Sequence, residues 1–393
     1  MAFKITGILG LQLNQLRRAK QNYWEIRERG LEWMLHTRNQ LLRGRKSVMH
    51  KAGIAWSLFK NIARLGGYRV VDLLSGRELI AIALTEHMGD IVAAQPIAAY
   101  IRALHPKARL VWVTRRPFNE LINAFGVIDR ITPVLCISEW AMLRDSGIFS
   151  RHYDLHVNKR SCPICKQTIF RKTGNPLIDT ENYYSFGTLL AIMCQNAGLP
   201  ILEAGPELII PDVTIRKIDG IGLPEKFIVL HTRSNESSRD WKADKWTLLA
   251  QRLLDKTDYS LIEIGLSAML KLESNRHLSC CGKFSIIETA EIMRRATLFI
   301  GIDSGPAHIA NAVKTYGVIL KGAYRAFPSY LSYSGGYGTG ETAFIISAQG
   351  QASIITVAEA FEASLTMLRK YDLLTSQANY YKPNQIVSVL HYE

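Results

Sequence analysis

Three short segments hold most of the residues in this chain that could do chemistry. They are residues 85–90 (Thr-Glu-His-Met-Gly-Asp), 231–241 (His-Thr-Arg-Ser-Asn-Glu-Ser-Ser-Arg-Asp-Trp) and 303–310 (Asp-Ser-Gly-Pro-Ala-His-Ile-Ala). Each segment directly follows a short apolar run of the kind that forms a buried strand. Because open α/β sheets bind ligands at the carboxyl ends of their strands, we expect all three segments to face bound ligand.

The segment 303–310 has the order of a strand end, a tight turn and a helix start. The apolar run 298–302 precedes it, and the turn residues Ser304, Gly305 and Pro306 come before helical spacing begins. A helix that starts at the carboxyl end of a strand exposes free backbone N–H groups and the positive end of its dipole. This pattern predicts an anion site, most often one for a phosphate.

Strand-like and helix-like segments alternate over most of the chain. Strands are predicted at residues 79–84, 109–114, 131–136, 153–157, 227–231, 261–265, 298–302, 317–320 and 343–347. Helices are predicted at residues 91–104, 117–125, 139–148, 183–197, 243–256, 285–295 and 354–369, with one more starting at Gly305. This alternation predicts an α/β protein whose parallel sheets carry helices on both faces.

One interruption of the alternation predicts two domains. Residues 200–224 are rich in Pro, Gly and charged residues, which is typical of a linker. We therefore predict two Rossmann-like domains facing a central cleft, at residues 78–205 and 206–370, followed by a C-terminal tail of residues 371–393. The glycine-rich residues 334–340 lack the Gly-Lys-Ser/Thr ending of a P-loop, so we expect a surface loop there.

The positive charge of the chain is concentrated at its N-terminus. The formal net charge is +14, and residues 1–77 contain 15 Lys/Arg but only 4 Asp/Glu. Residues 78–393 are nearly balanced, with 33 Lys/Arg and 30 Asp/Glu. Apolar residues recur at helical spacing among the basic ones, for example Trp24, Leu31 and Leu35, so the segment is predicted to form basic amphipathic helices.

Such a basic extension, residues 1–77, has three possible roles. It could lie on an anionic membrane or hold an anionic glycolipid. It could bind nucleic acid through the phosphates, or it could pack on the body as a helical hairpin with solvated charges. The even charge of the remaining chain offers no basic track, so no nucleic acid partner is expected. We expect peripheral contact with the inner face of the cytoplasmic membrane.

Apolar runs and cysteines indicate the compartment. No run approaches the roughly 18–20 residues that span a bilayer, and residues 5–13 lack a convincing signal-peptide cleavage site, so a cytoplasmic location is expected. The six cysteines should then stay reduced. Cys162 and Cys165 have the spacing of half a zinc ribbon, but a structural zinc site normally has four ligands. No metal is therefore expected, and these two cysteines are the weak candidates for one.

The order of the motifs resembles that of glycosyltransferase family 9, the lipopolysaccharide heptosyltransferases. The first half has Gly-Asp-Ile-Val-Ala-Ala-Gln-Pro, then a His-Pro pair and a Val-Trp-Val-Thr strand. The second half has the His-Thr-x-Ser loop, Arg-Asp-Trp with a second Trp five residues on (Trp241 and Trp246), and Asp-Ser-Gly-Pro-Ala-His-Ile-Ala. The resemblance covers about residues 79–370 and leaves out the basic extension.

This resemblance implies a metal-independent, inverting glycosyltransferase of the GT-B type. The N-terminal domain would hold the acceptor, a lipopolysaccharide-type glycolipid, and the C-terminal domain a nucleotide sugar such as ADP-heptose, with no cofactor. Asp90, the Asp of the Gly-Asp motif, would be the general base, because a sugar hydroxyl is a weak nucleophile until its proton is removed. Asp90 could instead cap the following helix, where the helix dipole would lower its pKa.

The resemblance also implies which residues bind the donor. Ser304 and Gly305 would hold the diphosphate, and Arg239 stands where the family has a Lys that touches phosphate. The full set of expected donor-binding residues is Thr232, Ser234, Arg239, Glu273, Asp303, Ser304, Gly305 and His308.

Some of these donor residues also have plain structural explanations. Thr232 and Ser234 could donate to the diphosphate, or their hydroxyls could cap their own loop. Asp303 could bind sugar hydroxyls or stabilise the turn, and His308 could be a satisfied helix histidine. Glu273, a possible ribose contact, departs from the spacing of the family.

The acceptor site is expected beside the base, at Glu86, His87 and Gly89, although exposed loop polarity explains Glu86 and His87 equally well. Transfer of a heptose is the leading hypothesis for the function. Transfer of another sugar, transfer to a protein acceptor, and a non-catalytic glycan-binding or scaffold protein of the same fold are the alternatives. Donor hydrolysis and transfer assays separate these possibilities.

Overall fold

The computed structural model describes residues 52–380, apart from residues 163, 235, 237–238 and 324–329. The chain divides into a unit of residues 1–59 and a larger compact unit of residues 60–393. The helices predicted within residues 1–51 lie outside the described residues. Within the described part of the chain, no helix is both long enough and apolar enough to cross a bilayer.

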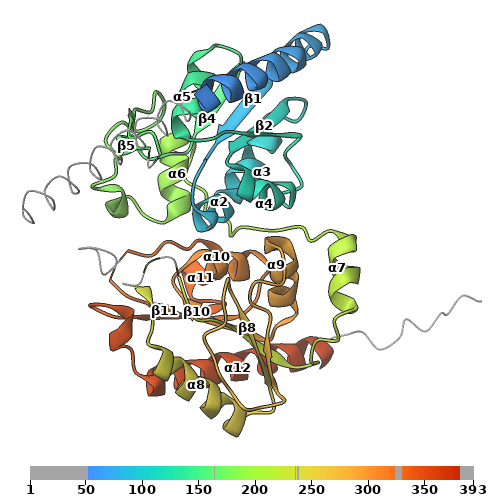
Figure 1. Cartoon of the computed structure of the whole chain (residues 1–393), viewed down its shortest axis with the longest axis vertical. Coiled ribbons are helices and arrows are strands. Elements are labelled where there is room, and N and C mark those ends of the chain that lie inside the picture. Colours follow the sequence, from blue (N-terminus) through green and yellow to red (C-terminus); the bar gives the residue numbers. More distant parts are fainter. Residues whose placement is uncertain (1–51, 163, 235, 237–238, 324–329, 381–393) are drawn as a thin grey trace, which may run out of the picture. The chain divides into compact units, whose positions relative to one another are not determined.

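The first half of the larger unit contains a parallel sheet with the strand order β3-β2-β1-β4 (Figure 1). Its strands are β1 (Leu79–Ala83), β2 (Arg109–Thr114), β3 (Arg130–Pro133) and β4 (Arg151–Asp154). In register, Ile80 of β1 lies between Leu110 of β2 and Arg151 of β4. Every residue of β1 is buried, which explains its continuous apolar sequence, because a central parallel strand has no solvent face.

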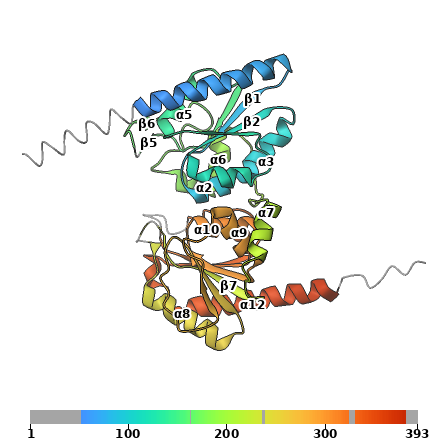
Figure 2. The same ribbon diagram turned by 45° about the vertical axis from the view of Figure 1, so that its right-hand side comes forward.

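Helices cover both faces of this first sheet. They are α2 (Met88–Ala93), α3 (Gln95–Leu104), α4 (Asn119–Asn123), α5 (Ile137–Asp145) and α6 (Leu189–Ala197), with 3₁₀ turns η1 (Arg116–Phe118) and η2 (Tyr183–Ser185). Apolar side chains of α3 and α6, including Ile97 and Leu190, pack with Ile82 and Trp112 of the sheet. Helix α5 and residues 60–74 of the helix that spans residues 52–74 cover the opposite face (Figure 2).

The helix of residues 60–74 is held to the sheet by buried polar contacts. The side-chain amide of Asn61 donates to Glu139 Oε1 of α5 at 2.9 Å. The buried carboxylate of Asp72 accepts two bonds of 2.9 Å from the guanidinium of Arg109 on β2. Leu65 is fully buried between these anchors. Contacts with the body of the protein therefore begin well before residue 78, where the first domain was predicted to start.

The second half contains a parallel sheet with the strand order β12-β11-β10-β7-β8-β9. Its strands are β7 (Phe227–His231), β8 (Ser260–Ile264), β9 (His277–Ser279), β10 (Leu298–Ile302), β11 (Gly317–Lys321) and β12 (Ala343–Ser347). The helices are α7 (Asp212–Asp219), α8 (Ala243–Lys256), α9 (Ile286–Arg295), α10 (Gly305–Ala312), α11 (Gly335–Thr339) and α12 (Val357–Tyr380), with the turn η4 (Ala352–Ile354). Helices α8 and α12 cover one face of this sheet, and α9 and α10 cover the other (Figure 1).

Each sheet reverses its strand order at one point, and the candidate segments follow those points. In the first sheet the chain continues from β1 to β2 on one side, and later returns as β4 on the other. In the second sheet β7 lies between β8 and β10 in the same way. Ligands of open α/β sheets bind at such switch points. Residues 85–90 follow β1, while His231 ends β7 and residues 303–310 follow β10.

These observations confirm the predicted α/β class and the two Rossmann-like halves, although several helices differ from the prediction. The helix predicted at residues 91–104 is two helices, because Pro96 begins α3 and cannot extend α2. Helix α6 begins later than predicted, because Gly187 has a φ of 98° and interrupts the helical conformation. Helix α12 continues past the predicted end at residue 369.

The predicted linker at residues 200–224 contains a helix, α7. Pro211 precedes the helix in an extended conformation with a φ of −65°, and Asp212 supplies an acidic first turn. Ile218 is its buried residue. The helix is short and lies between Pro211 and Gly220, and this Pro- and Gly-rich surrounding is typical of a linker, which explains why the helix was missed.

The glycine-rich residues 334–340 form helix α11 and are not the surface loop that we predicted. Tyr337 is fully buried, and its hydroxyl donates to the carbonyl of Thr315 at 2.9 Å. Gly335 has a φ of 62°, and a Cβ there would lie 2.4 Å from the Cα of Gly205. The glycines therefore allow close packing around an anchored tyrosine, where we had predicted a mobile loop.

Candidate functional site

A chain of buried hydrogen bonds holds the loop that follows β1. The backbone N–H of Thr85 donates to Nε2 of His156 at 3.0 Å, so this ring nitrogen carries no proton. The other nitrogen, Nδ1, then donates to Asp154 Oδ1 at 2.7 Å. The indole N–H of Trp140 donates to Asp154 Oδ2 at 3.0 Å. Asp154 and His156 were not predicted as site residues, because only the pairing of β1 with β4 brings them beside the loop.

The acceptor-site candidates Glu86 and His87 lie together with an arginine that we did not predict. The guanidinium of Arg160 forms an ion pair with the Glu86 carboxylate. It also donates to Nε2 of His87 at 2.9 Å. His87 has a φ of 58°, and its side chain is exposed. Arg160 lies on the antiparallel hairpin of β5 (Arg160–Ser161) and β6 (Thr168–Ile169), far along the chain from the loop that it contacts.

Asp90 is the third residue of α2 and is half-buried. Burial raises the pKa of Asp90, and nearby Glu86 adds to this, while the positive charges of His87, Arg160 and Arg239 act in the opposite direction. His87 occupies the N-cap position of α2, and no side chain caps that helix. The helix-capping alternative predicted a lowered pKa for Asp90, so the direction of the shift favours the base.

Helices α2 and α10 meet at two glycines. A Cβ at Gly89 would lie 2.8 Å from the ring Cδ2 of His308, and a Cβ at Gly305 would lie 2.4 Å from Cε of Met88. A side chain at Gly89 would collide with the buried ring of His308, whereas one at Gly305 would meet the flexible end of Met88, which can move aside. Gly305, expected to contact the diphosphate, therefore faces Met88 in this structure.

Ser304 stands at the start of α10 in an extended conformation, with a φ of −160°. Its hydroxyl donates to the carbonyl of Ile302 at 3.1 Å and lies 3.2 Å from Nδ1 of His231. No side chain caps α10, so the backbone N–H groups at the start of this helix have no side-chain acceptor. His231 is buried, and burial lowers its pKa to about 4, so its ring is neutral near pH 7.

The carboxylate of Asp303, which precedes Ser304, bonds to the buried Tyr333. The hydroxyl of Tyr333 donates to Asp303 Oδ1 at 2.6 Å. Burial, with Asp303 adding to it, raises the pKa of Tyr333, which therefore stays protonated and keeps donating. Burial lowers the pKa of Lys321, the last residue of β11, and the charge of Asp303 opposes this shift. Tyr333 and Lys321 were absent from the predicted site.

His308 lies on α10 and is buried. Its ring centroid is 4.5 Å from that of Tyr333, and its Nε2 is 3.4 Å from the hydroxyl of Ser332. Burial lowers the pKa of His308 to about 4, with Asp303 opposing and Arg239 reinforcing the shift. A neutral imidazole at pH 7 can position a phosphate through a hydrogen bond, but it supplies no positive charge.

Arg239 brings a positive charge to the turn after β10. Its Nη1 donates to the carbonyl of Asp303 at 3.5 Å, and its Nε lies 3.3 Å from a Glu236 carboxylate oxygen. The positive charge of Arg239 also acts to lower the pKa values of Asp90 and His308. Arg239 is thus a cation of the second half whose charge acts on Asp90 and His308.

The two hydroxyls predicted to donate to phosphate are used inside the protein. Thr232 donates to Oε1 of Glu263 at 2.9 Å, and both residues are buried. The hydroxyl of Ser234 contacts Asp240 Oδ1 at 2.9 Å and the carbonyl of Glu236 at 2.8 Å. In this structure both hydroxyls therefore bond to groups of the protein itself, as the loop-capping alternative predicted.

Glu263 of β8 anchors the loop of residues 231–241 through a hydrogen bond from Thr232. Its carboxylate accepts from the hydroxyl of Thr232 at 2.9 Å and from the backbone N–H groups of Met269 at 2.8 Å and Leu270 at 3.3 Å. Glu273 lies exposed in the segment between β8 and β9, and within the described residues it makes no hydrogen bond or ion pair with the site. The buried carboxylate of Glu263 thus stabilises the loop that carries Thr232, and the ribose contact of Glu273 stays a prediction.

Glu263→Ala is expected to lower the free energy of unfolding by roughly 2–4 kcal/mol. The change leaves several buried donors without an acceptor, and each such donor costs about 1–3 kcal/mol. Urea unfolding followed by circular dichroism measures the effect. Glu273→Gln is the matched control and should leave stability unchanged. Equal losses in the two variants would contradict the anchoring role of Glu263, and weaker donor binding in Glu273→Gln alone would restore the predicted ribose contact.

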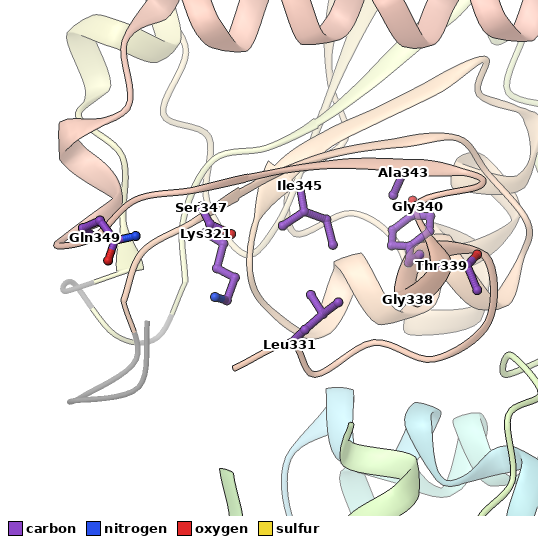
Figure 3. Close-up of a pocket in the computed structure, with 10 residues that line it drawn as sticks. Lys321, Leu331, Gly338, Thr339, Gly340, Ala343, Ile345, Ser347 and Gln349 are labelled. Carbon is purple, nitrogen blue, oxygen red and sulfur yellow. The ribbon is translucent and has the colours of Figure 1, made fainter. Parts of the chain in front are cut away.

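A pocket of about 490 Å³ opens beside Lys321 in the second half (Figure 3). Lys321 of β11 and Ile345 of β12 project toward the segment that carries Leu331, and Gly338 and Thr339 of α11 close one end. None of the predicted site residues lines it. The electrostatic contact between Lys321 and Asp303 links this pocket to the turn after β10.

Comparisons with known proteins point to one family for part of the second half. A sequence profile of glycosyltransferase family 9 (heptosyltransferase) matches residues 212–324. Lipopolysaccharide heptosyltransferase 3 of Escherichia coli is 28% identical over 117 residues, which are 28% of this chain and 34% of that protein. The chain therefore spans about a third of the length of this curated relative.

Solved structures share the fold over most of the chain. A glycosyltransferase of family 9 from Veillonella parvula has a TM-score of 0.59 at 17% identity, over 75% of this chain and 98% of that one. The ADP-heptose lipopolysaccharide heptosyltransferase II of Escherichia coli has a TM-score of 0.57 at 16% identity, over 75% and 99%. The shared fold is of the GT-B type, with two Rossmann-like domains. The profile match over residues 212–324 adds that this part of the second half is similar to glycosyltransferase family 9.

Proposed function

We propose that this protein transfers a heptose, or a related sugar, from a nucleoside diphosphate donor to a hydroxyl of a lipopolysaccharide-type glycolipid. The observation that carries the proposal is the close approach of α2, which holds Asp90, to the uncapped start of α10, beside which Arg239 contacts the carbonyl of Asp303. A proton acceptor and a phosphate-binding cation are the two groups that such a transfer needs on opposite sides of the sugar. ADP-heptose, named for the Escherichia coli relative, is the donor to test first.

In the proposed reaction Asp90 removes the proton from the acceptor hydroxyl while that oxygen attacks the anomeric carbon. The bond from this carbon to the diphosphate breaks as the new bond forms, so the configuration inverts. A raised pKa makes Asp90 a stronger base than an ordinary Asp, provided that it is ionised at the working pH. Glu86, His87 and Gly89 surround Asp90 on the acceptor side, in the domain proposed at residues 78–205.

The diphosphate leaves with negative charge, and the second half supplies the groups that stabilise it. Arg239 provides a permanent positive charge, and the uncapped start of α10 provides backbone N–H groups and its dipole. Ser304, Asp303 and the neutral His308 would orient the donor, in the domain proposed at residues 206–370. These groups can balance the charge of the leaving group, so the proposed mechanism assigns no step to a metal ion.

A panel of nucleotide sugars tests the donor, and a transfer assay tests the reaction. The correct donor should raise the melting temperature, because a ligand at 100 times its Kd stabilises the folded protein by about 2.7 kcal/mol. The same donor should then label a lipopolysaccharide core that lacks its outer sugars. Stabilisation by a different nucleotide sugar would change the donor. Stabilisation by the donor without transfer to any glycan would leave a binding protein, contrary to the proposal.

We also propose that the protein works at the inner face of the cytoplasmic membrane. Besides the charge of residues 1–77, the helix of residues 60–74 exposes apolar side chains near its end. Val70 and Val71 are 58% and 56% exposed, and Leu73 and Leu74 are 60% and 85% exposed. Exposed apolar residues next to basic ones are typical of surfaces that lie in the interface of an anionic bilayer.

Replacing Leu73 and Leu74 together by Ser should weaken binding to phosphatidylglycerol vesicles by more than about tenfold. Withdrawing even two methylene groups from the interface costs about 1.6 kcal/mol at about 0.8 kcal/mol each. Co-sedimentation at low and high salt measures the effect, and salt should weaken the remaining electrostatic part. Leu266→Ser, at a leucine that is 88% exposed in the second half, is the control. Equal binding by all three proteins would exclude this surface.

A further inference from the structure

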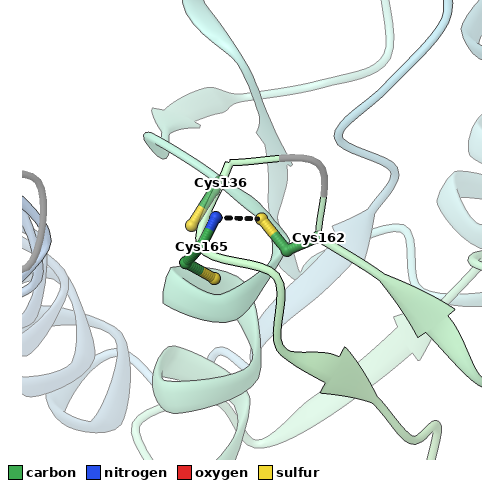
Figure 4. A group of neighbouring side chains, drawn as sticks. All are labelled: Cys136, Cys162 and Cys165. Carbon is green, nitrogen blue, oxygen red and sulfur yellow. Dashed lines mark hydrogen bonds between the residues drawn. The ribbon is translucent and has the colours of Figure 1, made fainter. Parts of the chain in front are cut away.

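Three cysteines that are separated in the sequence converge in the first half of the larger unit (Figure 4). Cys136 stands at the N-cap position of α5, while Cys162 and Cys165 lie in the turn between β5 and β6. The three Sγ atoms lie within 4.8 Å of one another. Cys136 and Cys162 are buried, and Cys165 is half-buried.

Hydrogen bonds to Cys162 hold the turn that carries Cys162 and Cys165. The backbone N–H of Cys165 donates to Cys162 Sγ at 3.5 Å. The N–H of Lys166 donates to the carbonyl of Cys162 at 2.9 Å, and the N–H of Cys162 donates to the carbonyl of Gln167 at 2.8 Å. These bonds hold the turn in the conformation that brings the Sγ atoms of Cys162 and Cys165 within 4.8 Å of that of Cys136.

We propose that Cys136, Cys162 and Cys165 together bind one thiophilic divalent metal ion, Zn²⁺ or Fe²⁺. Thiolates bind zinc tetrahedrally at about 2.3 Å, which puts the sulfur atoms about 3.8 Å apart. The observed separations reach this geometry with shifts of about an ångström. A disulfide would use only two of the three sulfur atoms. The buried hydroxyl of Ser138, 2.8 Å from Cys165 Sγ, or a solvent molecule completes the fourth position.

The ion connects the β5–β6 hairpin to the start of α5. Each strand of this hairpin has two residues, and so short an isolated hairpin is marginally stable in water. The same hairpin carries Arg160, which contacts Glu86 and His87 next to Asp90. Metal binding therefore positions Arg160 at the acceptor side of the site. This consequence rests on the proposed function, whereas the metal site itself does not.

Metal analysis of the full-length protein, purified under reducing conditions, tests the site directly. Mass spectrometry of the digested protein should find about one Zn or Fe per chain, and it distinguishes the two metals. Cys136→Ser, Cys162→Ser and Cys165→Ser should each lose most of that metal. Cys194→Ser and Cys281→Ser are the controls and should keep it. Retention of metal by all three cluster variants would overturn the proposal.

Two further measurements cover variants that fail to fold. Wild-type protein that has been stripped by a chelator should take up about one Co²⁺ and show the absorption of cobalt bound to thiolates. Protein without metal, with two fewer reactive thiols in denaturant than the six in the sequence, would show a disulfide and overturn the proposal. Stripped protein should also keep its thermal shift with the donor while it loses transfer activity. If no donor binds at all, the proposed function fails while the metal count still stands.

Discussion

Asp90→Asn is expected to lower kcat by about 10²–10⁴-fold, which is the usual contribution of a general base. The amide keeps the size of the carboxylate but cannot accept the proton of the acceptor hydroxyl. Donor affinity should stay close to that of the wild type, because the proposed donor groups lie on α10 and in the loop of Arg239. Steady-state transfer assays and a separate measurement of donor binding check the two parts. Unchanged turnover would remove Asp90 from the base role.

The same substitution should not reduce stability near pH 7. The pKa of Asp90 is higher in the folded protein than in the unfolded chain, mainly because of burial. A carboxylate of this kind disfavours folding once the pH exceeds its unfolded value of about 3.9. The neutral Asn side chain removes that penalty, so the melting temperature should be equal or higher. A marked fall in melting temperature would mean that lost activity reflects lost structure.

The pH dependence of kcat/KM offers a second test of the base. Activity should fall as the pH drops through the raised pKa of Asp90, and removal of a neighbouring positive charge should move this fall to higher pH. Arg160→Gln removes such a charge, whereas Lys159→Gln removes the exposed partner of Asp179 and is the control. Glu86→Gln tests the neighbouring carboxylate. Loss of the acidic limb in that variant would make Glu86 the base.

Buried strands were the most predictable part of the fold. The runs at residues 227–231, 298–302 and 343–347 match β7, β10 and β12 residue for residue. The first two are central strands with every residue buried, so their apolar sequence is continuous. Short helices in Pro- and Gly-rich stretches are harder to predict, because these residues are typical of loops and linkers. Helix α7, which lies between Pro211 and Gly220, and α11, which contains three glycines, were missed for this reason.

The candidate site was predictable only where function depends on a local motif. Asp90 and Ser304 follow buried strands directly, and a strand followed by a helix start can be read from neighbouring residues. His156, Glu263 and Arg160 contact these segments from distant parts of the chain. Their partners depend on the order of strands in each sheet and on the hairpin of β5 and β6, which the sequence alone does not indicate. The cysteine cluster is a similar case. The spacing of Cys162 and Cys165 can be recognised in the sequence, but Cys136 lies far from them in the chain and only the fold brings it to them.

Arg239→Ala is expected to weaken donor binding by about 10- to 100-fold. A hydrogen bond to a charged group contributes about 1.5–3 kcal/mol, and the donor carries its charge on the diphosphate. Arg239→Lys should recover part of the loss, because it restores the charge but not the planar fork of the guanidinium. Arg233→Ala, at an exposed position of the same loop, is the matched control and should bind the donor normally. Equal losses in both alanine variants would point to a general charge effect of the loop.

The kinetics of Arg239→Ala also show whether Arg239 acts on the donor alone or on the transition state. If KM rises while kcat is unchanged, the guanidinium binds the bound donor and the departing diphosphate equally. We expect kcat to fall as well, because negative charge grows on the diphosphate only as the glycosidic bond breaks. In addition, the loss of the Arg239 charge should move the acidic limb of Asp90 to higher pH. A fall in kcat together with that shift would require Arg239 and Asp90 to act on the same substrate, one from each half of the protein.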